Sequence, residues 1–116
     1  MKLGEHLARL NAGLPPPCVV VAASGRPTSL SIYLPNGETW IVPWSRFSRA
    51  RLSDEELTLE FADDEIIVRG QNLAEMLKDV AGLRVDSLRT IEPDYRALLD
   101  SRAPCISELE FRAVPP

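Results

Sequence analysis

The segment that decides the fold is Thr28–Val42, which reads TSLSIYLPNGETWIV. Its first half alternates apolar and polar residues, which is the period-two pattern of a half-buried strand. Asn36-Gly37 comes next, and Asn-Gly strongly favours a tight hairpin turn because both positions tolerate a positive φ. The segment Thr39–Val42 then provides the return strand. The stretch therefore predicts a β-hairpin.

A second hairpin follows along the chain. Leu57–Phe61 alternates in the same way, Ala62-Asp63-Asp64 turns the chain, and Ile66–Arg69 returns. Between the two hairpins Pro43 ends the first return strand, because proline has no N–H to donate to a neighbouring strand. The segment Trp44–Arg51 has no clear pattern.

The rest of the chain supplies flanking elements. A helix is expected at Asn72–Ala81, with Asn72 as its cap, Glu75 three residues later, and Gly82 in a left-handed conformation after its end. Further helices are expected at Leu3–Leu14, before three prolines, and after Pro93. Strands are expected at Cys18–Ala23, Leu83–Ile91 and Ile106–Val114.

These elements predict an α+β fold. We expect one twisted antiparallel sheet that contains both hairpins and the flanking strands, with the Asn72–Ala81 helix packed on one face; a compact barrel is the alternative. A chain of 116 residues fits a single domain, 1–116. Within it, residues 1–17 form an N-terminal helix and a proline-rich connector, and residues 18–114 form the sheet and helices.

The residues from about 30 to 91 resemble a group of small uncharacterised bacterial proteins of unknown function. The shared layout is a hairpin that ends in proline and an aromatic residue (Pro43-Trp44), strands that end at Phe61 and Gly70, a helix that begins Asn72-Leu73, and an Arg84-Val85 strand. The resemblance implies a shared fold. It implies no activity, cofactor or site residue.

Composition narrows the function classes. The chain is 45% hydrophobic and 26% charged, the balance of an ordinary globular protein, and its net charge is −4. A dedicated nucleic-acid binder is usually basic, since its affinity comes largely from contacts with phosphate. The first 18 residues match no signal peptide, and no apolar run is long enough to span a bilayer. We expect a cytoplasmic protein without a membrane-spanning segment.

Catalytic and metal-binding motifs are absent from the sequence. His6 is the only histidine, Cys18 and Cys105 are far apart without a CxxC partner, and no glycine-rich phosphate-binding loop is present. The adjacent acids Asp63, Asp64 and Glu65 could serve as a small carboxylate-based site, but adjacent side chains in a turn point in different directions. We therefore expect no enzyme, no cofactor and no metal site.

The most suggestive cluster lies between the two hairpins. Both tryptophans and three arginines fall within twelve residues, and these residue types are enriched in binding hot spots. Trp40 and Trp44 would face the same side of a continuing strand, and large apolar residues on both faces of the return strand favour association. The candidate partner-binding residues are Trp40, Trp44, Arg46, Phe47, Arg49 and Arg51.

Three interpretations remain open for this cluster. The first is a non-enzymatic protein-binding or structural module that acts as a homodimer or with a protein partner. The second is RNA or single-stranded DNA binding, with bases stacked on Trp40 and Trp44 and phosphates held by the arginines. A third interpretation assigns no function to the cluster: Trp40 or Trp44 caps the core, and the arginines remain in water or pair with the acidic second half of the chain.

Overall fold

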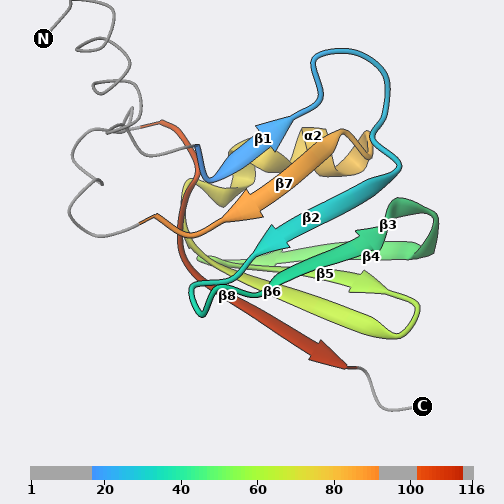
Figure 1. Ribbon diagram of the computed structural model, residues 1–116. Coiled ribbons are helices and arrows are strands. Elements are labelled where there is room, and N and C mark those ends of the chain that lie inside the picture. The colour runs from blue at the N-terminus through green and yellow to red at the C-terminus, as the bar shows by residue number, and fades with distance from the viewer. Residues whose placement is uncertain (1–16, 92–101, 114–116) are drawn as a thin grey trace, which may run out of the picture.

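The strands form two four-stranded sheets in the computed structural model, which describes residues 17–91 and 102–113 (Figure 1). The first sheet has the order β1-β7-β2-β3 and the second has the order β4-β5-β6-β8. Adjacent strands are antiparallel apart from β2 and β7, which are parallel. The strands are β1 (Val19–Val21), β2 (Ser29–Tyr33), β3 (Thr39–Pro43), β4 (Phe47–Ser53), β5 (Glu56–Phe61), β6 (Asp64–Gln71), β7 (Val85–Arg89) and β8 (Cys105–Ala113).

Both predicted hairpins are confirmed. In β2–β3, Ile32 is opposite Trp40, and the Leu34 N–H donates to the Glu38 carbonyl at 2.9 Å to close the turn. Gly37 has φ +91°, but Asn36 does not take the positive φ of a two-residue Asn-Gly turn: the Gly37 N–H donates to Leu34 O at 3.1 Å, and the turn spans residues 35–37. In β5–β6, Leu59 is opposite Ile66. The alternation of apolar residues therefore predicts the local pairing correctly.

The expectation that both hairpins belong to one sheet is wrong. Pro43 ends β3, and a short 3-10 helix, η1 (Trp44–Arg46), redirects the chain into β4 of the second sheet. The Trp44 N–H donates to Thr28 O at 3.0 Å, and the Ala62 N–H donates to Arg46 O at 2.9 Å. The connection is thus hydrogen-bonded to both sheets. These bonds fix the path of the chain from the first sheet to the second.

The predicted helix is shorter and begins differently. A 3-10 turn, η2 (Leu73–Met76), precedes a single α-helix, α2 (Leu77–Ala81). Asn72 does not cap it; its backbone is left-handed, at φ +59°, and its side-chain amide donates to Ala103 O at 3.2 Å. The Asn72 side chain thus bonds to the segment before β8, and the expected capping hydrogen bond to the helix does not form.

The end of α2 also differs from the prediction by one residue. Leu83 takes the left-handed conformation, φ +56°, where Gly82 was expected to do so. The Leu83 N–H donates to Val80 O and the Arg84 N–H donates to Asp79 O, which is the pattern of a Schellman cap. These two bonds hold a leucine in a backbone conformation that usually favours glycine.

One hydrophobic cluster joins the elements. It includes Leu30 and Ile32 from the first sheet and Leu59 and Ile66 from the second, all at 0% exposure. Burial of this apolar area is the main force that holds the two sheets together. The helical segment adds Leu73, Met76 and Val80 to the same cluster.

The remaining expectations are partly covered. The strands predicted at Cys18–Ala23, Leu83–Ile91 and Ile106–Val114 are present as β1, β7 and β8. The helices predicted at Leu3–Leu14 and after Pro93 lie outside the described residues. Across residues 17–91 and 102–113, no helix has the length and apolar character that a bilayer crossing requires.

Candidate interaction surface

The exposed large apolar side chains of the described residues all lie on the β2–β3 hairpin. They are Tyr33, Trp40 and Ile41, with exposed fractions of 37%, 41% and 66%. We call these three residues the β3 patch. They lie on both faces of this one hairpin, and exposed large apolar side chains gathered on one element are typical of an interaction site.

Trp40 lies at the rim between the two sheets. Its ring stacks on Phe111 of β8, with the centroids 4.4 Å apart and the planes inclined by 14°. Its indole N–H donates to the Glu38 carboxylate at 3.1 Å. Both contacts orient the ring while leaving two fifths of its surface in water, so Trp40 is presented in a fixed position.

Ile41 and Tyr33 lie on the opposite face of the hairpin from Trp40. In the β2–β3 register, Ile41 is opposite Ser31 and Tyr33 is opposite Thr39, so these side chains share one face. The Arg89 guanidinium from β7 lies over the Tyr33 ring at 4.3 Å. Ile41 is the most exposed member of the β3 patch.

The backbone of β3 is open on the side away from β2. The bonds Leu34 N–H to Glu38 O and Trp44 N–H to Thr28 O set the alternation of the β2–β3 ladder. In that alternation Trp40 and Val42 bond to β2, and Thr39 and Ile41 direct their N–H and C=O groups outward. Among the described strands, none pairs with β3 on this outward side.

β3 differs from the other three sheet edges in its length or its charge. β1 is only three residues long, β4 carries Arg49 and Arg51, and β8 carries Glu108, Glu110 and Arg112. Short length and charged side chains are the usual protections of an edge strand against pairing with another chain. β3 reads TWIVP: it has no charged residue, and Pro43 at its end is the one protective residue that it carries.

A shallow groove of about 230 Å³ runs beside β3. Trp40–Pro43 line it from β3, and Asp63, Asp64 and Phe111 line it from the second sheet. Arg46, also in the lining, bonds to Asp63 at 3.1 Å. The groove continues the β3 patch across the gap between the two sheets.

The six residues predicted as partner-binding do not form one surface. Trp44 is only 4% exposed, and its indole N–H donates to Val85 O at 2.9 Å. Phe47 is half-buried and packs with Trp44 and Phe61, at centroid distances of 5.2 and 5.5 Å. Trp40 and Trp44 were expected on one side of a continuing strand, but β3 ends at Pro43, and Trp44, in the 3-10 turn, is buried in the core while Trp40 stays partly exposed at the rim.

The three predicted arginines are exposed and separate from one another. Arg46 pairs with Asp63, and Arg49 pairs with Glu60 across the β4–β5 ladder; the hydrogen bond that Arg49 donates to the Glu60 carboxylate raises the pKa of Arg49. Arg51 is opposite Thr58 on the same ladder. Two of the three guanidinium groups thus already have carboxylate partners in this chain, and Trp44 is absent from the surface that would stack bases.

The three adjacent acids do not converge. Asp63 bonds to Arg46, and Glu65 pairs with Arg112 of β8 at 3.7 Å. Asp64 begins β6, so its side chain and that of Glu65 alternate across the sheet. No group of three metal-ligating side chains occurs in the part of the chain that the structure describes.

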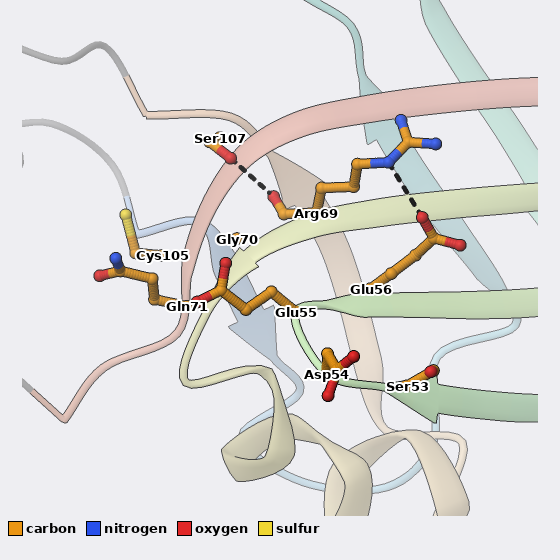
Figure 2. Close-up of a pocket in the computed structure, with 9 residues that line it drawn as sticks. All are labelled: Ser53, Asp54, Glu55, Glu56, Arg69, Gly70, Gln71, Cys105 and Ser107. Atoms are coloured by element: carbon orange, nitrogen blue, oxygen red, sulfur yellow. Dashed lines mark hydrogen bonds and ion pairs between the residues drawn. The ribbon is translucent and has the colours of Figure 1, made fainter.

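A larger cavity, of about 560 Å³, lies at the other end of the second sheet and is drawn in Figure 2. It is lined by the β4–β5 turn (Ser53–Glu56), by Arg69–Gln71 of β6, and by Cys105 and Ser107 of β8. The sequence did not predict this cavity, because its lining comes from segments that are far apart along the chain. Asp54, at φ +53°, makes a tight turn between β4 and β5.

Arg69 organises the rim of this cavity. It bonds to Glu56 at 3.0 Å (Figure 2) and to Glu108 at 3.1 Å, and the bond to Glu56 raises the pKa of Arg69. The Ser107 hydroxyl donates to the Arg69 carbonyl at 3.1 Å. These bonds join β5, β6 and β8. Arg69 therefore has a structural role that needs no ligand in the cavity.

Comparisons with known proteins identified no relative of this chain. No protein-family model matches the chain, and neither a curated protein nor a solved structure is detectably similar to it. The resemblance to small bacterial proteins stays a prediction. Function has to be argued from the surface itself.

Proposed function

We propose that this protein is a non-enzymatic protein-binding module that associates with itself through the β3 patch. The observation that carries the proposal is the combination at one sheet edge of exposed Trp40 and Ile41 with unpaired, uncharged backbone. An edge strand of this kind is a ready template for another strand. We place the module in the cytoplasm, a compartment that keeps a thiol such as that of Cys105 reduced.

The binding of a protein surface is favoured over nucleic acid by the chemistry of the patch. Base stacking needs aromatic faces flanked by cations that are available to phosphate. Trp40 has the acidic Glu38 bonded to its indole and Asp63 and Asp64 in the adjoining groove. These carboxylates would repel a phosphate backbone, whereas they pose no obstacle to an apolar strand.

The experiment is the mass of the protein in solution across a concentration series, by sedimentation equilibrium. The wild-type mass should rise towards that of a dimer as concentration rises. Ile41→Lys should weaken association by about tenfold or more, because a charge at a buried anchor costs upwards of 1.4 kcal/mol. The matched control is Ala81→Lys, which adds the same charge to an exposed position of α2 and should associate like the wild type.

Two results would overturn the proposal. One is a monomer mass for the wild type at every concentration. The other is binding of a single-stranded oligonucleotide that weakens steeply with salt and disappears in Trp40→Ala, which is the behaviour of a nucleic-acid surface.

A further inference from the structure

The outward groups of β3 form a pattern that can be matched to a partner strand. Thr39 and Ile41 each direct one N–H donor and one C=O acceptor away from β2. Pro43, the next residue in the same orientation, offers its C=O alone because proline has no N–H. The edge thus offers donors at its beginning and middle, and only an acceptor at its end.

This pattern is complementary to itself when a second strand runs antiparallel. With Ile41 opposite the same residue of the second copy, each Ile41 N–H meets the other's C=O. Thr39 is then opposite Pro43 of the second copy, so its N–H donates to the proline carbonyl. The absent N–H of Pro43 leaves only the Thr39 C=O unmatched, at the margin of the pairing.

The charges at the two ends of β3 favour the same direction. Glu38 precedes the strand, and Arg46 lies just beyond its end, with 61% of its side chain exposed. Antiparallel pairing brings the Glu38 end of one copy to the Arg46 end of the other, where Arg46 forms an ion pair with Asp63, so Glu38 does not meet Glu38 of the second copy. Parallel pairing would instead place Glu38 beside Glu38.

The side chains agree with this register. Directly opposed residues of an antiparallel pair share a face, so the two Ile41 side chains would cover each other on one face. On the other face Trp40 would be opposite Val42 of the second copy, which covers the exposed part of its ring and the adjoining groove. Trp40 and Ile41 thus lie within this contact, whereas Tyr33, on β2, lies one strand away from it.

We infer that the partner at the β3 edge is β3 of a second copy, paired antiparallel about a two-fold axis at Ile41, so that the two first sheets become one continuous sheet. A two-fold contact uses the same surface on both copies, which a self-complementary strand provides. This inference rests on the proposed function and adds the partner strand, its direction and its register.

The test is disulfide cross-linking of single-cysteine substitutions, with mass measured in parallel under reducing conditions. In a hydrogen-bonded antiparallel pair the two Cα atoms are about 5.5 Å apart, within the range a disulfide spans. Ile41→Cys should therefore form a covalent dimer under mild oxidation. Thr39→Cys is the matched control, because two Thr39 positions would be separated by about 13 Å along the strand.

The expected result is roughly tenfold more covalent dimer for Ile41→Cys than for Thr39→Cys, given the narrow distance range of a disulfide. The wild type controls for Cys18 and Cys105 and should stay uncross-linked. Reduced Ile41→Cys that associates but does not cross-link, or equal cross-linking at both positions, would overturn the pairing and leave self-association standing. Absence of association in every variant would overturn the proposed function as well.

Discussion

The two tryptophans should differ in their contribution to stability. Trp44 is 4% exposed and its N–H satisfies the carbonyl of Val85, which is itself fully buried. Truncation of a buried tryptophan to alanine costs about 3–5 kcal/mol. Trp44→Phe keeps most of the ring but leaves the Val85 carbonyl without its donor, which costs about 1–3 kcal/mol. Trp40→Ala removes a ring that is 41% exposed and one aromatic stack, and should cost about 1–2 kcal/mol.

The assay is urea unfolding followed by far-ultraviolet circular dichroism, which does not depend on tryptophan as the probe. Protein concentration is kept low and equal, because association would add to apparent stability. The free energy of unfolding of a protein of this size is about 5–15 kcal/mol, so Trp44→Ala should remove roughly a third or more of it. A cost for Trp40→Ala equal to or above that for Trp44→Ala would refute the assignment of Trp44 to the core and Trp40 to the surface.

Two further predictions concern the second sheet. Gly70→Ala should lower the free energy of unfolding by about 3 kcal/mol. A Cβ at this position would lie 1.8 Å from the backbone oxygen of Cys105, so β6 would have to move away from β8. An unchanged urea midpoint would contradict this prediction. The hydrogen bond from Arg112 lowers the pKa of Glu110 from its ordinary value of 4.5, so the stabilisation it gives is present at neutral pH and is lost as pH falls through the lowered pKa. Between about pH 5 and pH 3, unfolding free energy should therefore fall more steeply for the wild type than for Glu110→Gln, and parallel curves would show that the pair contributes nothing.

Local pairing could be predicted from the sequence because it depends on neighbouring residues. Asn36-Gly37 and the alternation around it fix the β2–β3 register, and the same holds for β5–β6. The assignment of these hairpins to different sheets depends on contacts between distant segments. The hydrogen bonds from Trp44 to Thr28 and from Ala62 to Arg46 hold the connection between the two sheets, and no local sequence pattern predicts them.

The candidate site was predicted in part for a similar reason. The surplus of large apolar residues on both faces of Thr39–Val42 drew attention to Trp40, which the structure leaves partly exposed, and exposed Ile41 belongs to the same signal. Trp44 was grouped with Trp40 by a spacing of four residues, which holds only if the strand continues. Because Pro43 ends the strand, that spacing loses its meaning, and residue type alone could not separate a core tryptophan from a surface one.

The most direct test of the β3 edge is amide hydrogen exchange of Ile41, measured by NMR at low and high protein concentration. The Ile41 N–H points away from β2, so it should exchange rapidly in the dilute monomer and become protected as the dimer forms. The Val42 N–H bonds to β2 and should be protected at both concentrations, which makes it the internal control. Rapid exchange of Ile41 at a concentration where the mass is that of a dimer would contradict the account.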